Sequence, residues 1–581
     1  MLILLLVCLL TSNALTLQRE KSILFSRIVF TGFCLASVLS YNSLHVTSLS
    51  KGIGIYGGLF NVTTFTQAFN IFILIISAMI LLLTSFYPRK ALVSEYSSPI
   101  NLIFSKWSYN KAIISNTTGG QFRIIEYALV IVFVLCGSLF LMSTGDLISI
   151  FLSIELQSYG LYILCTLYRD SESSTASGLT YFLLGGLSSC FILLGSALLY
   201  ANSGTTNLDN IYVMSSISEI QNVPGFDLVN SLYSSQPYYF HLALIIMCVG
   251  FLFKVSAAPF HFWSPSVYDG IPTIVTTFVA VVAKISIFAF LLELVYYTEY
   301  SFFGFSWKSI FLLSSLFSLV IGSVLGLTQF RIKRLFAYST ISHVGFILLA
   351  LSVNTTESLQ AYIFYILQYS LSNVNAFVLL VAIGFTFYLY VYAKDNEEGK
   401  WVSGDKENDL RDRNNSPLQL ISQIKGYFYL NSFLAVSLGI TLFSFVGIPP
   451  LVGFFAKQMI LSAALDQGYV FMSFVAIITS VIGAGYYLSL IKQIFFFKHD
   501  YMINPVLLQK SSYIKFAGYI SSYSTENNNS KKILFSPENI TLSGSLSSLI
   551  SINTLLLTLF IFMPTEWFNI VSILSLSLYG I

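Results

Sequence analysis

Three lysines in apolar surroundings are the side chains of this 581-residue sequence best placed for chemistry. Lys254 ends an apolar run, Lys284 is the fourteenth residue of the run 271–297, and Lys457 follows a stretch rich in glycine and proline. A charge inside a bilayer costs free energy, and such residues mark ion or proton paths by default. The alternative for Lys254 is a side chain that reaches the membrane surface, and for Lys284 a structural ion pair. The lysines thus predict a path for protons or other small cations.

Prolines interrupt the apolar sequence close to two of these lysines. Pro259 follows Lys254 by five residues, and Pro449 and Pro450 precede Lys457. Proline lacks a backbone N–H and crowds the preceding turn, so a helix breaks or kinks at each site. Freed backbone groups are tolerated in lipid only where protein or water satisfies them. We therefore expect two broken helices, each interrupted near mid-membrane beside a titratable side chain.

Two further titratable residues belong to this set. His261 lies just beyond the first proline, and Glu155 is the one carboxylate near the middle of a predicted span. Glu126, Asp146 and Glu293 lie closer to helix ends and are expected to be structural. The chemistry suggested is therefore charge pairing and proton exchange between a carboxylate, lysines and histidine within the membrane.

The composition predicts an all-α polytopic membrane protein, because 55% of residues are hydrophobic and only 9% are charged, against about 25% charged in soluble domains. No Walker loop, dinucleotide-binding glycine fingerprint or cysteine cluster is present, so we expect no redox centre and no metal in this chain. No basic stripe with interleaved aromatics suggests nucleic acid. The first ten residues are apolar without a basic leader, which predicts a span and no signal peptide.

Apolar runs of about 20 residues predict fourteen spanning helices. The runs are 2–17, 23–40, 68–87, 124–142, 147–168, 176–200, 241–258, 271–297, 310–327, 335–353, 362–392, 427–465 with its break, 470–497 and 546–564. The segment 567–578 is predicted to be a final interfacial helix. Lysines and arginines concentrate in alternate connections, as the positive-inside rule requires. Both termini and the connection 201–239 should therefore lie on the non-basic side, and 393–423 on the basic side.

The two broken helices are the seventh and twelfth spans, five spans apart. Interrupted helices at matching places in two halves point to inverted repeats. We accordingly divide the chain into a three-helix segment with a loop on the basic side (1–123), two five-helix repeats (124–300 and 301–497), and a second loop on the basic side with a C-terminal helix or helices (498–581).

Four motifs, in order, resemble the antiporter-like membrane subunits of proton-pumping NADH:quinone oxidoreductase, respiratory complex I. They are 154–158, 254–273, 331–343 and 447–457, within a match that runs from about 124 to 497. Lysine in place of glutamate at position 457 is similar to the chain 2 branch of this family. The aromatic-rich composition and the lack of a presequence suit a mitochondrially encoded, fungal protein of the inner membrane.

The resemblance implies a proton path of one carboxylate, three lysines and two histidines: Glu155, Lys254, Lys284, Lys457, His261 and His343. Glu155 and Lys254 would form the charge pair that couples one subunit to its neighbour, and Lys284 would be the central proton-binding site. Lys457 would lie on the connection to the opposite side, with the histidines in the hydrated path between. Many members carry a lysine where this chain has Thr180, so the role of that lysine is in doubt here.

The resemblance also implies a translocase subunit that binds no cofactor, with NADH, FMN, iron–sulfur clusters and ubiquinone in partner subunits. Its expected partners are other membrane-arm subunits, including neighbouring antiporter-like subunits, and phospholipids. Two alternatives stay open: a monovalent cation/proton antiporter subunit of the same superfamily, and a structural coupling spacer that does not conduct protons. Ion transport without NADH would favour the first, and full pumping by a charge-neutral Lys284 variant would favour the second.

Overall fold

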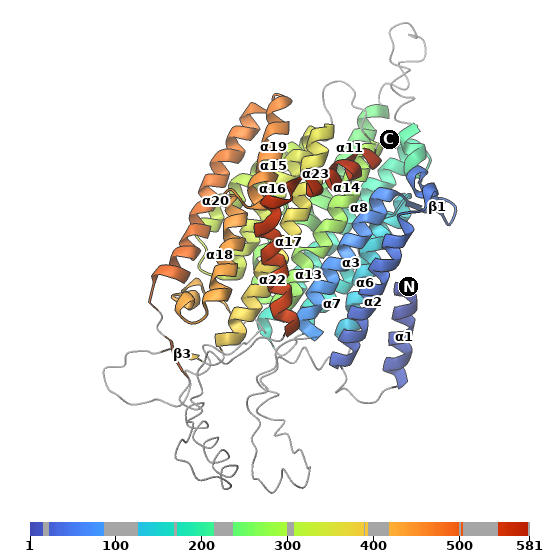
Figure 1. Ribbon diagram of the computed structural model, residues 1–581. Helices are drawn as coiled ribbons and strands as arrows, with labels where there is room; N and C mark the ends of the chain where they lie inside the picture. Colours follow the sequence, from blue (N-terminus) through green and yellow to red (C-terminus); the bar gives the residue numbers. More distant parts are fainter. Residues whose placement is uncertain are drawn as a thin grey trace, which may run out of the picture.

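The protein is a single elongated bundle of roughly parallel and antiparallel helices in the computed structural model (Figure 1). The described residues are 1–15, 22–85, 126–167, 171–213, 236–298, 307–387, 390–392, 418–498, 501–503 and 544–578. Nine helical stretches of this described part are long and apolar enough to cross a membrane, and four shorter ones are also apolar. The chain is therefore a multi-pass, predominantly helical membrane protein.

The first half of the described chain contains the N-terminal helices and the helices around Lys254 and Lys284. They are α1 (Leu2–Leu15), α2 (Ser22–Ser43), α3 (Thr64–Ser85), α6 (Glu126–Met142), α7 (Leu147–Thr166), α8 (Glu172–Ser203), α11 (Gln236–Val255), α12 (Trp263–Gly270), α13 (Thr273–Ala280) and α14 (Val282–Tyr297). Polar side chains begin two of them: Asp146 accepts a hydrogen bond from Ile148 N at α7, and Ser171 accepts one from Ser174 N at α8. Such N-caps satisfy backbone donors that the first turn leaves free.

The second half contains α15 (Ser309–Leu327), α16 (Ile332–Val353), α17 (Thr356–Phe387), α18 (Ser432–Val446), α19 (Val452–Asp466), α20 (Val470–Phe496), α22 (Gly544–Leu559) and α23 (Pro564–Leu578). In Figure 1 the N-terminal helices α1 to α3 and the helices α18 to α20 lie at opposite edges of the bundle. The α13–α14 stretch and α17 are almost wholly buried between them. Helices α22 and α23 pack on α17, and α23 crosses it obliquely.

Both predicted helix interruptions are present. Helix α11 ends at Val255 and helical structure resumes at Trp263, while α18 ends at Val446 and α19 begins at Val452. At the second break Gly447 has φ +84°, a left-handed conformation that glycine adopts without a steric penalty. A Cβ atom on Gly453 would collide with the Ser444 carbonyl oxygen, so the two ends of this break are in close contact.

The structure corrects several of the predicted elements. The segment after Pro259 forms a separate short helix, α12, and the span predicted at 271–297 is present as one stretch, Thr273–Tyr296, with a one-residue turn at Val281 between α13 and α14. The span predicted at 362–392 ends at Phe387, and its last residues form a strand. The start of the span predicted at 427 is a 3-10 turn, Tyr427–Tyr429, before α18. The helix propensity of each segment alone does not predict these changes, because contacts with neighbouring elements cause them.

Two small antiparallel ribbons modify the all-α prediction. Strands β1 (Ile53–Ile55) and β2 (Phe60–Val62) pair in the register Ile53 with Val62. Strands β3 (Tyr390–Tyr392) and β4 (Tyr501–Ile503) pair with Tyr392 opposite Tyr501, joining the ends of α17 and α20. The predicted connections 86–123, 214–235, 393–417 and 504–543 lie outside the described residues.

Candidate functional site

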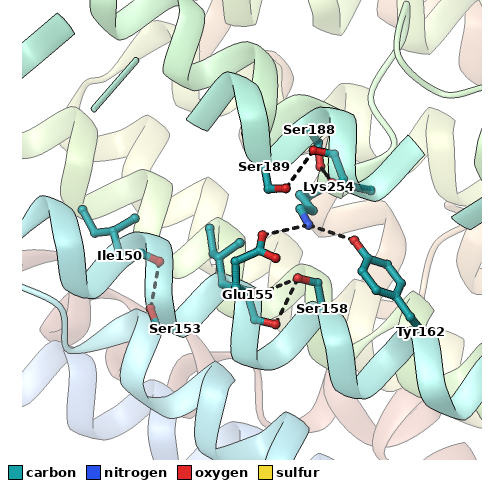
Figure 2. Close-up of polar contacts among 11 residues, drawn as sticks. Ile150, Ser153, Glu155, Ser158, Tyr162, Ser188, Ser189 and Lys254 are labelled. Carbon is teal, nitrogen blue, oxygen red and sulfur yellow. Dashed lines mark hydrogen bonds and ion pairs between the residues drawn. The ribbon is translucent and has the colours of Figure 1, made fainter. Parts of the chain in front are cut away.

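The predicted charge pair is formed between α7 and α11. Lys254 Nζ lies 3.9 Å from Glu155 Oε1, with the side chains 5% and 13% exposed. The ammonium group also donates to Tyr162 Oη at 3.2 Å, and Figure 2 shows it between the carboxylate and the phenol. The Tyr162 hydroxyl lies against Gly185 of α8, where any Cβ atom would collide with it. Tight packing of three helices therefore holds this pair in place.

Helix α8 contributes only locally bonded hydroxyls beside the pair. Ser188 and Ser189 lie near Lys254 in Figure 2, and their hydroxyls donate to carbonyls of their own helix. Thr180, on the same helix, is exposed and donates to Ser177 O. The Thr180 side chain thus points away from the buried part of the site.

Lys284 is the most enclosed of the three lysines, with 1% exposure on α14. Its Nζ donates to Ser256 Oγ at 3.0 Å and lies 3.4 Å from Thr340 Oγ1 on α16. It also lies 5.9 Å from the centre of the Tyr268 ring, a cation–π distance. Within the described residues Lys284 forms no ion pair, so neutral hydroxyls and an aromatic face supply its environment.

Ser256 links the central lysine to the charge pair through the first helix break. It is the second residue after Lys254 and has φ +65°, a left-handed conformation that is costly for a residue with a Cβ. This break therefore brings Lys254, which pairs with Glu155, and Ser256, which binds Lys284, within two residues of each other in the chain. Sequence reasoning included Ser256 in a motif but gave it no role, because its contact with Lys284 exists only in three dimensions.

His343 lies on α16, one helical turn beyond Thr340, between two tyrosines. Its Nδ1 is 2.7 Å from Tyr365 Oη and its Nε2 is 3.3 Å from Tyr487 Oη. The Tyr487 hydroxyl also bonds to the hydroxyl of Ser339. Hydroxyls and imidazole nitrogens in this arrangement can pass protons along hydrogen bonds. The sequence signal missed here was the series of tyrosines at helical spacing on α17.

Lys457 lies at the second helix break. Its Nζ donates to Phe445 O at 3.0 Å and to Val446 O at 2.8 Å, the last carbonyls of α18. The ammonium is also 5.5 Å from the centre of the Phe346 ring. One pocket is lined by both His343 and Lys457. The structure therefore brings together two of the predicted residues from the second half of the chain.

His261 stands apart from these contacts. It is buried at 5% exposure in the segment between α11 and α12, beside the ring of Phe262. Its Nδ1 has no hydrogen-bond partner within the described part of the chain. Likewise, no described group of three or more His, Cys, Asp or Glu side chains is placed to hold a metal ion.

Comparisons with known proteins identify the family of this chain. The family model described as "NADH:quinone oxidoreductase/Mrp antiporter, TM" matches residues 144–394 and 407–483. NADH-ubiquinone oxidoreductase chain 2 of Rhizopus oryzae is 43% identical over 569 residues, 97% of each chain. A chain of respiratory complex I from Thermus thermophilus matches with a TM-score of 0.63 at 23% identity, covering 97% of both chains. A chain of the Mrp complex from a Dietzia species matches with 0.67 at 16%, covering 100% and 97%.

The chain therefore belongs to the membrane-subunit family shared by NADH:quinone oxidoreductases and Mrp antiporters. Within that family, its identity to the Rhizopus oryzae protein over nearly the whole length places it among the NADH-ubiquinone oxidoreductase chain 2 proteins. It is a membrane-arm subunit of respiratory complex I, as the motifs predicted. The two solved structures, at their low identities, establish the fold alone.

Proposed function

We propose that this chain translocates protons across the inner mitochondrial membrane, driven by electron transfer from NADH to ubiquinone in partner subunits. The observation that carries the proposal is Lys284, an ammonium group almost fully enclosed and held by two hydroxyls with no ion pair among the described residues. Burial without a carboxylate disfavours a permanent charge, so such a lysine can lose and regain its proton. NADH, FMN, iron–sulfur clusters and ubiquinone belong to those other subunits.

The Glu155–Lys254 pair acts as the switch. Two unit charges about 4 Å apart interact by about 4 kcal/mol at an effective dielectric constant of about 20. Moving one proton against about 150–200 mV costs roughly 3.5–4.6 kcal/mol. Forming or separating a pair such as this one, at 3.9 Å, is thus on the scale of the work required. A change in the pair would alter the proton affinity of Lys284 through the break at Ser256.

The path continues from Lys284 through the second half of the chain. Thr340 contacts the lysine, and His343 follows one turn later on the same helix. His343 shares a pocket with Lys457, which lies at the second break. These contacts support a route in which Lys457 exchanges protons with the opposite side of the membrane. His261 would be a further hydrated position near the first break.

The proposed topology has fourteen spans, with two inverted five-helix repeats at 124–300 and 301–497. Both termini and the connection 201–239 would face the intermembrane space, and 393–423 the matrix. Its support is the alternation of basic residues between connections. Cysteine labelling in intact mitoplasts should place positions 220 and 405 on opposite sides; labelling of both from one side would overturn the span count. Neighbouring antiporter-like subunits and phospholipids would cover the exposed apolar faces of α8 and α20.

Two alternatives remain distinct hypotheses. The fold is shared with a chain of an Mrp complex, so the fold alone does not separate a redox-driven subunit from a cation/proton antiporter subunit. The 43% identity over 97% of a chain 2 protein favours the redox-driven reading. A structural spacer would keep the charged residues but would not need a neutral form of Lys284.

The proposal is tested at Lys284. Lys284→Met removes the charge at similar bulk, and it should assemble because an unpaired buried charge is itself a cost. Proton pumping should be lost, and quinone reduction should fall with it. Lys284→Arg should also impair pumping, because arginine stays protonated at any relevant pH. A native gel reports assembly, and quinone reduction with proton release reports function; an assembled Lys284→Arg complex with wild-type pumping would refute the proton-site role.

A further inference from the structure

One buried polar contact joins α7 to α14, between the charge pair and the central lysine. The amide nitrogen of Gln157 lies 3.1 Å from Ser286 Oγ, and the amide oxygen lies 3.2 Å from the same atom. Gln157 is 3% exposed and Ser286 is fully buried. Ser286 Oγ also donates to Ala283 O at 3.0 Å, so breaking the contact would leave the Gln157 amide, and not the serine hydroxyl, buried without a partner, which is costly.

The position of this contact follows from helix geometry. Gln157 is two residues after Glu155, and Ser286 is two residues after Lys284. Two positions on an α-helix are about 200° apart, so the members of each couple point to nearly opposite faces. Glu155 thus faces Lys254 while Gln157 faces α14, and Ser286 faces α7 while Lys284 faces Ser256.

Helix α7 also packs closely against α6, which itself contacts α14. A Cβ atom on Gly137 of α6 would lie only 2.6 Å from the backbone nitrogen of Gln157. The α6 backbone therefore packs directly on α7 where Gln157 projects toward α14. Closely packed helices move as rigid elements, so a shift of α7 is passed to whatever its side chains bind.

We propose that the Gln157–Ser286 contact is a positioning link that passes a shift of α7, caused by the Glu155–Lys254 pair, to α14 and hence to Lys284. The inference rests on the proposed proton-translocating function and adds two residues to it. Neither side chain is charged, and neither is asked to carry a proton. They couple the position of Lys284 to the state of the charge pair. The break at Ser256 provides a second connection between the same two sites.

The competing explanation is that the contact only satisfies two buried polar groups. The two explanations differ for a variant in which both groups are removed. Each single change, Gln157→Leu or Ser286→Ala, alters one partner, and Ser286→Ala leaves the Gln157 amide unsatisfied. The double variant leaves neither group unsatisfied, so stability should recover. A purely structural contact would then leave pumping normal, whereas a positioning link would not.

The experiment uses the intact complex in sealed membrane vesicles. Assembly is read on a native gel, and protons moved are measured per NADH oxidised. We expect the double variant to assemble and to move fewer protons per NADH than wild type. The matched control is Ser153→Ala, which removes a buried α7 hydroxyl that bonds only to carbonyls of its own helix and should keep the wild-type ratio.

A double variant with the wild-type ratio overturns the link, and so does a control that lowers the ratio equally. If the double variant does not assemble, Ser286→Ala alone carries the test, because it removes only one hydroxyl; Ser286→Thr, which keeps the hydroxyl, should retain the ratio. Full pumping by assembled Lys284→Arg would instead defeat the proposed function. Loss of pumping in Lys284→Arg together with a normal ratio in the double variant would defeat only the link.

Discussion

The two helix breaks hold a lysine in different ways. At the first break, Lys254 in the last turn of α11 faces the carboxylate of Glu155 on another helix. At the second break, Lys457 donates to the last carbonyls of α18, where the helix dipole is negative. A carboxylate can move away or take up a proton, whereas backbone carbonyls keep their partial charge. The first break is therefore suited to switching, and the second to a fixed relay.

The largest effect is expected from removing the carboxylate at the first break. Glu155→Gln keeps the size of the side chain but leaves the charge of Lys254 without its partner, which costs about 3–5 kcal/mol for a buried pair. We expect poor assembly on a native gel and strongly reduced quinone reduction and pumping.

The double variant Glu155→Gln with Lys254→Met removes both charges and separates stability from switching. It should regain assembly, since no unpaired charge remains, but it should not regain pumping. Wild-type pumping by this double variant would show that the first break is not a switch and would remove the contrast between the two breaks.

A smaller effect is expected at Ser256, a residue of the first break that has no counterpart at the second break. Hydrogen bonds to charged groups contribute about 1.5–3 kcal/mol, so Ser256→Ala should lower pumping by about tenfold or more. Ser256→Gly removes the same hydroxyl, but glycine suits φ +65°. The Gly variant should therefore be more stable than the Ala variant by about 1 kcal/mol in thermal unfolding of the purified complex. Equal pumping by wild type and both variants would exclude Ser256 from the coupling.

The last expected effect separates hydrogen bonding from proton exchange at Lys457. Lys457→Met leaves the Phe445 and Val446 carbonyls without their donor, at a cost of about 1–3 kcal/mol. Lys457→Arg can still donate to them and should assemble normally, but pumping should fall because arginine holds its proton. Thermal unfolding and vesicle pumping check the two outcomes. Full pumping by Lys457→Arg would show that Lys457 only caps the C-terminal end of α18 and does not exchange protons.

The sequence predicted the parts of this fold that depend on local chemistry. Apolar runs located the helices, and prolines located both breaks. Sequence did not predict the one-residue turn at Val281, because no proline or glycine marks it and Tyr369 of α17 binds the Ala280 carbonyl beside it. The strand at Tyr390–Tyr392 was missed for a similar reason, since its partner lies far along the chain.

The candidate site was predictable as a set of residues but not as a set of contacts. Glu155 and Lys254 could be paired from the resemblance, and the structure brings them together. The partners of Lys284 could not be predicted, because Ser256 and Thr340 are common residue types on two other elements. His261, included for its type and place, lies buried without a described partner for its Nδ1.

Two tyrosines of α17 make the backbone around Lys284 suitable for infrared measurements. Tyr369 Oη donates to Ala280 O at 3.1 Å and Tyr362 Oη donates to Phe288 O at 2.7 Å, so they bind carbonyls on either side of Lys284. A carbonyl that accepts a phenolic hydrogen bond absorbs infrared light at a lower frequency than a free one. An isotope label at Ala280 or Phe288 would therefore report, as a frequency shift during turnover, how the helix around the lysine moves.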